Sequence, residues 1–118
     1  LIMAVTASAQ VSKKLKTLLS AVIVTGAGSS VQLSTQAHTF QACGLTSAGA
    51  WASAIKIQGS NVASPAATEW VDLGTITLTL GTAQTCDGFA SSAKWKWIRG
   101  NVTSISGTDA AVTATMGY

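Results

Sequence analysis

The side chains that could do chemistry are few and widely spaced in this sequence. Among 118 residues there is one histidine, His38, and the nearest cysteine is Cys43. A Ser–His–Asp or Cys–His arrangement can be drawn from any chain this rich in serine and threonine, so these residue types alone indicate no nucleophile. We therefore interpret His38 as a partly exposed strand residue and predict that the protein is not an enzyme.

The four acidic residues stand singly and do not form a carboxylate pair or a metal site. Asp87 precedes a glycine and Asp109 follows a Gly-Thr pair, both typical of turns. Glu69 and Asp72, three residues apart on an expected strand, point to opposite faces, which disfavours paired-carboxylate hydrolysis. No helix or Lys-Ser/Thr pair follows the glycines of segment 26–28, so this is no phosphate loop. We predict no catalytic residue, no metal and no cofactor.

Four tryptophans are the strongest functional candidates. Tryptophan buries a large area and is enriched at interfaces and on sugar-stacking platforms. If the expected strand alternates, Trp95 and Trp97 share one face with Arg99. Core packing is the simplest interpretation; an intermolecular contact or a carbohydrate platform, above all at Trp51 or Trp70, remains open.

Two cysteines, Cys43 and Cys86, lie far apart in the chain. Their spacing matches no zinc or redox motif, and a single bridge would be far from a disulfide framework. We favour two small buried thiols in a β core over a disulfide.

Charged residues make up 9% of the chain, and the net charge is +3. So few charges suit a protein that is packed against neighbours better than a solitary monomer. Lys13, Lys14 and Lys16 form the one basic cluster, which is too sparse for direct nucleic-acid binding and suits an acidic partner. No apolar stretch reaches the roughly 18 residues of a membrane helix, so we expect no membrane partner.

Period-two alternation and turn residues predict about eight short strands. Ile55 and Ile57 alternate with polar neighbours, as do Ile76 and Leu78 further along. The expected strands are Thr17–Thr25, Ser30–Ser34, His38–Ala42, Ala54–Gln58, Trp70–Leu73, Thr75–Leu80, Lys94–Val102 and Ala111–Met116, with a loop at Gly81–Ser92. The pattern indicates an all-β fold, an antiparallel β-sandwich or jelly roll, with an extended arm over 1–16 and a single domain over 17–118.

Three segments resemble small structural proteins of tailed bacteriophages: the IQGSN of Ile57–Asn61, the WVDLGTITL of Trp70–Leu78 and the WIRGNVTSISGT of Trp97–Thr108. The closest type is the capsid decoration, or cement, protein with a jelly-roll-like sandwich. The likeness covers about half of the chain, from Ile55 onward. The segment Asn61–Glu69 is longer than the tight turn usual in that family, and a loop of this length could reach a neighbouring subunit.

The resemblance implies a virion protein on the capsid exterior, assembled in the cytoplasm of the host bacterium. It would bind the major capsid protein, bridge its subunits and self-associate as a homodimer or homotrimer. We expect the arm with Lys13, Lys14 and Lys16 to contact the capsid, and Trp51, Pro65 and Trp70 to be further partner-binding residues.

Two alternatives remain open. The protein could be a tail or fibre module that binds host glycan through Trp51 or Trp70 and the loop Asn61–Glu69. It could instead be a secreted bacterial adhesion domain, which would require a Cys43–Cys86 disulfide.

Overall fold

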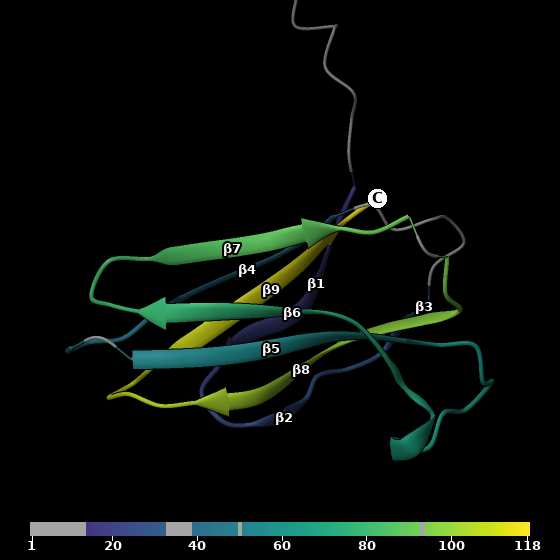
Figure 1. The fold of residues 1–118 in the computed structure, drawn as a ribbon, viewed down its shortest axis with the longest axis horizontal. Helices are drawn as coiled ribbons and strands as arrows, with labels where there is room; N and C mark the ends of the chain where they lie inside the picture. The colour runs from purple at the N-terminus through teal and green to yellow at the C-terminus, as the bar shows by residue number, and fades with distance from the viewer. Residues whose placement is uncertain (1–13, 33–38, 50, 93) are drawn as a thin grey trace, which may run out of the picture.

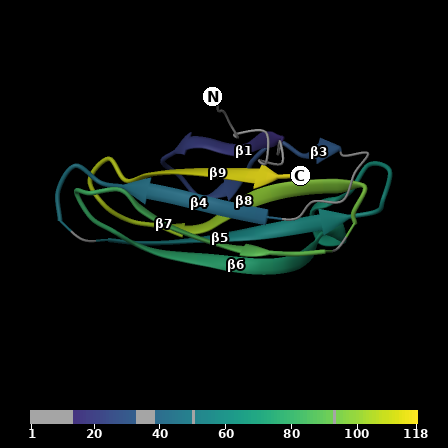
Figure 2. The same cartoon turned by 90° about the horizontal axis from the view of Figure 1, so that it is seen from above.

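The protein folds into two antiparallel sheets that pack face to face as a β-sandwich (Figures 1 and 2). This computed structural model describes residues 14–32, 39–49, 51–92 and 94–118. The expected all-β sandwich is confirmed. Its elements in chain order are β1 Leu15–Val22, β2 Gly26–Ala27, β3 Val31–Gln32, β4 Thr39–Leu45, β5 Trp51–Ser60, the short 3-10 helix η2 Ala67–Glu69, β6 Val71–Leu80, β7 Thr85–Ala90, β8 Trp97–Ile105 and β9 Ala111–Gly117.

The chain passes repeatedly from one sheet to the other. The four-stranded sheet has the order β1-β9-β4-β7, and the five-stranded sheet has the order β2-β8-β5-β6 with β3 also paired to β8. The hairpin β5–β6 stays within one sheet, whereas β4–β5, β6–β7, β7–β8 and β8–β9 each connect the two sheets. Almost every neighbouring pair of strands is therefore distant in sequence.

Alternation along the strands places the core between the sheets. Ile55, Ile57, Ile76 and Leu78 are buried, as the sequence pattern predicts, while the threonines between them on β6 are exposed. Strand β8 adds further apolar residues to this row in the five-stranded sheet, and the opposite sheet contributes a second row from β1, β4 and β9. The buried apolar residues are Leu18, Leu19, Phe40, Ala42, Ile55, Ile57, Ile76, Leu78, Ile98, Val102, Ala110, Val112, Ala114 and Met116.

Two aromatic rings close the sandwich against glycines. The Phe89 ring of β7 lies on Gly74 of β6, so close that an added Cβ would fall 2.6 Å from Phe89 Cζ. Trp95 packs in the same way on Gly59, where an added Cβ would fall 2.6 Å from its Cγ. In both places the absence of a side chain on one strand makes room for an aromatic ring, which comes from the opposite sheet at Gly74 and from the segment before β8 at Gly59.

The structure differs from the predicted strands in several places, of which three affect the architecture most. Thr85–Ala90 is strand β7, although its Asp-Gly pair indicates a turn in sequence, because the segment pairs with β4 over its whole length. The two strands expected on either side of Gly74 form one continuous strand, β6. Leu15 and Lys16, assigned to the arm by sequence, belong to β1, and residues 1–13 lie outside the described residues.

Strand β1 is an irregular edge strand. Its pairing with β9 shifts between Thr17 and Leu19 and again between Leu19 and Val22. The first shift lets the consecutive residues Leu18 and Leu19 both be buried, and Ala21 has a positive φ of 47°. Such bulges twist an edge and hinder open-ended pairing with the same edge of another copy.

Candidate functional site

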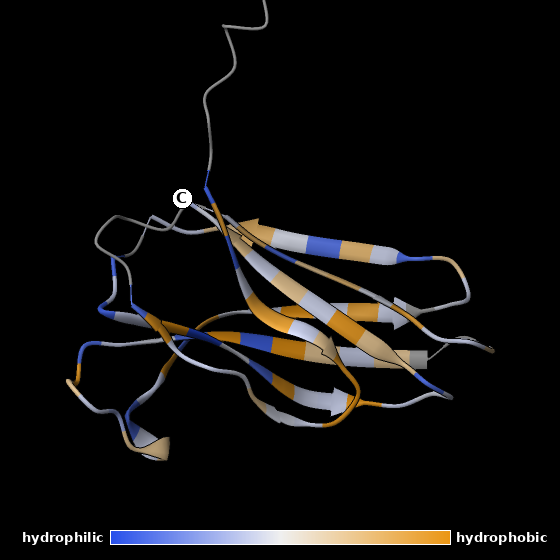
Figure 3. Ribbon diagram, turned by 180° about the vertical axis from the view of Figure 1, so that it is seen from behind, coloured by the Kyte–Doolittle hydropathy of each residue, from blue (hydrophilic) through white to orange (hydrophobic). Residues whose placement is uncertain are grey.

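The clearest candidate for a docking surface runs along β1 and the turn that follows it. Leu15 is 72% exposed at one end of the strand, and Ile23 and Val24 are 64% and 63% exposed at the other. Lys14 and Lys16, both exposed, flank Leu15. Figure 3 shows this side of the molecule, with hydrophilic colour where β1 begins and hydrophobic colour in the turn where it ends. We call these five residues the β1 surface.

An open groove lies along β1, lined by residues that fall in sequence between the two parts of the β1 surface and by the segment after β2. Its volume is about 290 Å³, and apolar atoms make up most of its wall. The lining residues come from β1 and from the segment after β2: Thr17, Leu18, Leu19, Ser20, Val22, Gly28 and Ser29. The groove therefore lies where the edge strand of one sheet meets the short strands of the other.

The basic residues expected at this place are only partly described. Lys13 lies outside the described residues. The backbone of Lys14 exchanges two hydrogen bonds with Tyr118, each 2.9 Å long, and Lys16 pairs with Met116. Lys14 and Lys16 are thus anchored beside the C-terminus, and their positions relative to the sheet are defined.

The other expected partner-binding residues belong to β5 or to the loop between β5 and β6 of the five-stranded sheet, whereas β1 is a strand of the four-stranded sheet (Figure 1). Trp51 begins β5, where it pairs with Leu80. Pro65 lies half-buried in the loop before η2, and Trp70 lies half-buried immediately before β6. The structure therefore does not bring the lysines and these residues into one site.

The two remaining tryptophans do not share a face, contrary to the alternation expected from the sequence. Strand β8 begins only at Trp97, and Trp95 packs against the hydrophobic core before it. Trp97 alternates with the buried Ile98 and so points to the outer side of the sheet. The interpretation as core packing is therefore confirmed for Trp95.

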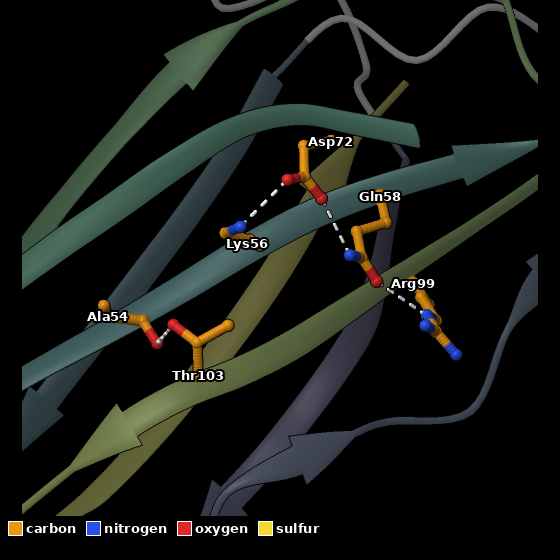
Figure 4. A network of polar contacts seen from close by, with 6 residues as sticks. All are labelled: Ala54, Lys56, Gln58, Asp72, Arg99 and Thr103. Atoms are coloured by element: carbon orange, nitrogen blue, oxygen red, sulfur yellow. Dashed lines mark hydrogen bonds and ion pairs between the residues drawn. The ribbon is translucent and has the colours of Figure 1, made fainter. Parts of the chain in front are cut away.

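A polar cluster crosses the outer face of the five-stranded sheet (Figure 4). Lys56 Nζ lies 2.9 Å from Asp72 Oδ2, and Gln58 Nε2 donates a hydrogen bond of 2.8 Å to Asp72 Oδ1. Gln58 Oε1 in turn accepts a bond of 2.9 Å from Arg99 Nε. The guanidinium carbon of Arg99 lies 4.2 Å from the centre of the Trp70 ring. We call these five residues the Arg99 cluster.

Strand register explains why these residues meet. Gln58 on β5 is directly opposite Asp72 on β6 and directly opposite Arg99 on β8. A bulge beside Ile57 aligns Asp72 with Gln58. Residues directly opposite each other on neighbouring strands have side chains on the same face of the sheet. The side chains of β5, β6 and β8 therefore form one continuous chain of contacts.

These contacts change the pKa values of Asp72 and Arg99. The hydrogen bond from Gln58 and then the one from Lys56 lower the pKa of Asp72, because both favour the ionised carboxylate. Partial burial lowers the pKa of Arg99, which nevertheless stays fully charged at neutral pH. One face of the Trp70 ring, on which a sugar could otherwise stack, is occupied by Arg99.

The favoured interpretation of the cysteines as free thiols is wrong. Cys43 and Cys86 form a disulfide with an S–S distance of 2.02 Å. They are directly opposite each other on β4 and β7, with their Cα atoms 4.1 Å apart. Cys43 alternates with the buried Ala42 and therefore faces outward, and Cys86 is exposed. The bridge thus lies on the surface of the four-stranded sheet.

In the described part of the chain, no group of three or more His, Cys, Asp or Glu side chains could hold a metal ion. No helix among the described residues is long and apolar enough to span a membrane. Comparison with known protein families, with curated proteins and with solved structures found no match to this chain.

Sequence reasoning missed the Arg99 cluster and the exposed turn after β1. A signal for the cluster was present, because Gln58 and Arg99 occupy polar positions beside buried isoleucines on two expected strands. The register that aligns these strands is not contained in that pattern. Ile23 and Val24 continue an apolar run, which predicts a strand and not an exposed turn.

Proposed function

We propose that this protein is a non-enzymatic virion component, a capsid decoration or cement protein of a tailed bacteriophage. In this proposal it binds the outer surface of the capsid, bridges subunits of the major capsid protein and reinforces the shell. It would be made in the cytoplasm of the host bacterium and act at the capsid exterior as a homodimer or homotrimer.

The observation that carries the proposal is the β1 surface. Leu15, Ile23 and Val24 are largely exposed in a protein whose other large apolar side chains mostly fill a well-packed core. Large apolar side chains gathered along one edge indicate a place where another protein binds. Lys14 and Lys16 beside them complement an acidic partner and would orient the encounter more than strengthen it.

The energetics favour binding by several copies together. Complete burial of one Leu, Ile or Val side chain is worth about 1.5–3 kcal/mol, while association itself costs on the order of 4–15 kcal/mol. A surface with three such side chains is therefore weak by itself. Self-association would present several β1 surfaces to neighbouring capsid subunits at high effective concentration, as bridging requires.

We also infer the finer classification as a jelly roll. If β2 and β3 count as one interrupted strand paired with β8, the sandwich has eight strands in two four-stranded sheets. Successive strands then alternate between the sheets except at the hairpin β5–β6. This alternation is what two Greek keys folded into a double sheet produce, and it supports the likeness to decoration proteins.

The direct test is co-sedimentation with undecorated phage capsids. The wild-type chain, an Ile23→Ser/Val24→Ser variant and a chain without residues 1–13 are compared; this deletion leaves β1 whole, unlike removal of 1–16. We expect the double substitution to weaken binding at least about tenfold, because two buried apolar contacts are lost. The deletion measures the arm with Lys13 separately.

The matched control is Leu45→Ser/Val71→Ser, which removes two exposed apolar side chains outside the β1 surface and outside the loop Asn61–Glu69. It should leave capsid binding unchanged. Equal losses in both double variants would show that general surface polarity matters and not the β1 surface. Absence of wild-type binding to every capsid tested would overturn the proposal.

A second candidate is a secreted bacterial adhesion domain, which requires the disulfide that the structure contains. Disulfides persist in oxidising surroundings such as the cell exterior, and also on virion surfaces after release, but they are rare in the cytosol. The Cys43–Cys86 bridge therefore fits either role. Binding of the oxidised protein to host cells but not to capsids would favour adhesion.

A further inference from the structure

Arg99 is a half-buried cation that forms no ion pair with a carboxylate in the described part of the chain. Among the described residues, the ion pair of its cluster joins Lys56 to Asp72, and Arg99 reaches that carboxylate only through the amide of Gln58. Removing a charge partly from water costs free energy unless an opposite charge compensates it. The Trp70 ring offers only part of this compensation, through its electron-rich face.

The cluster holds the guanidinium in one orientation. Gln58 must turn its oxygen toward Arg99, because its nitrogen is engaged by Asp72. This fixes the Nε–H of Arg99, while the Trp70 ring supports the plane of the group from one side. Figure 4 shows the terminal nitrogens of Arg99 directed away from Gln58. Among the described residues, these Nη groups have no hydrogen-bond partner.

A planar guanidinium with free, pre-oriented N–H donors matches a carboxylate, which it can bind with two parallel hydrogen bonds. The one acid in the cluster does not repel such a ligand strongly, since Asp72 is paired with Lys56. The net charge of +3 also favours an anion. We propose that Arg99 is a binding point for an acidic side chain, Asp or Glu, of a partner protein.

The geometry favours a protein carboxylate over an acidic sugar. A sugar would need the face of the tryptophan for stacking, and Arg99 occupies one face of Trp70. The surroundings are the outer face of a sheet with one row of exposed threonines on β6, which suits a broad protein surface. This inference does not rest on the proposed function, because it concerns the other sheet and can be tested on the isolated protein.

The test is an NMR titration of ¹⁵N-labelled protein with a short oligoglutamate peptide with blocked termini. The same peptide made of glutamine and a sialylated oligosaccharide are titrated in parallel. We expect the acidic peptide alone to shift the Arg99 Nε–H and Trp70 Nε1–H signals, while Trp95 Nε1–H stays in place. Raising the salt concentration should weaken the effect.

Two substitutions of Arg99 test separately its positive charge and the planar arrangement of its N–H donors. Arg99→Gln should weaken binding about tenfold or more, because it removes charge-assisted hydrogen bonds. Arg99→Lys keeps the charge but not the planar fork, and we expect intermediate binding. Lys94→Gln removes an exposed positive charge outside the cluster and is the matched control, which should bind like the wild type.

Several outcomes would overturn the proposal. Unmoved Arg99 and Trp70 signals in the folded wild type would do so, as would equal weakening by Lys94→Gln and Arg99→Gln. If the sialylated oligosaccharide shifted these signals more than oligoglutamate does, the ligand of Arg99 would be an acidic glycan and not a protein carboxylate. Because the wild-type titration decides the main point, the proposal can be tested even if an Arg99 variant is unstable.

Discussion

Removal of the Cys43–Cys86 disulfide should strongly destabilise the protein. The bridge closes a loop with a sequence separation of 43 residues, and the loop-closure relation for the unfolded chain then gives about 4 kcal/mol. This is a large part of the roughly 5–15 kcal/mol typical of a domain. The loss should be felt first at β7, an edge strand in which Phe89 packs against the core.

Urea unfolding followed by tryptophan fluorescence can measure this change. With a slope of about 1.5 kcal/mol/M, a loss of about 4 kcal/mol lowers the midpoint by roughly 2–3 M. The Cys43→Ser/Cys86→Ser variant should show this shift, and reductant should bring the wild type to the same midpoint. Because Cys86 is exposed, reductant should reach the bridge in the folded protein.

The variant itself is the control, since reductant should not change it. The reasoning is refuted if reductant leaves the wild-type midpoint unchanged, or if thiol titration of the oxidised, denatured protein finds two free thiols. A different result is that the bridge is formed in the wild type while the variant's urea midpoint is lowered by much less than roughly 2 M. That result would mean that the segments of β4 and β7 already stay close together in the unfolded chain without the bridge.

Two further predictions concern the five-stranded sheet. Gly59→Ala should cost about 1–3 kcal/mol by forcing a methyl group against the indole ring packed there, whereas Gly81→Ala, with open space around it, should change thermal stability little. Hydrogen bonds from Gln58 and Lys56 lower the pKa of Asp72 in the folded protein below its ordinary value of 3.8. The ionised carboxylate should therefore stabilise the fold slightly at a pH above 3.8, and this stabilisation should be lost as the pH falls through the lower pKa of the folded state. The advantage of the wild type over Asp72→Asn in chemical unfolding should therefore shrink in acid, and an advantage that grows on acidification would contradict this assignment.

Much of the fold could be predicted, because the alternation of apolar and polar residues along each strand indicates which side chains face the core. Ile55 and Ile57 on one strand, and Ile76 and Leu78 on the next, are buried as their period-two pattern indicates. Strand β7 could not be predicted, because Thr85–Ala90 contains small residues and a turn signal. Its extended conformation depends on pairing with β4, a contact between distant parts of the chain.

The candidate sites were less predictable than the fold. Lys14 and Lys16 were identified by their charge, but their attachment beside Tyr118 depends on the pairing of β1 with β9. From the sequence alone, Ile23 and Val24 are expected to continue the strand, whereas in the structure β1 ends at Val22 and both residues lie in the turn after it.

The class of architecture is already present in the amino-acid sequence: short alternating strands, a shortage of charge and an apolar stripe on each strand lead to a two-layer β protein. The meeting of Cys43 with Cys86, and the position of Arg99 over Trp70, depend instead on how the folded strands are arranged. The physical reason is that alternation has a range of a few residues. Which strands become neighbours, and in which register, depends on how the whole core packs.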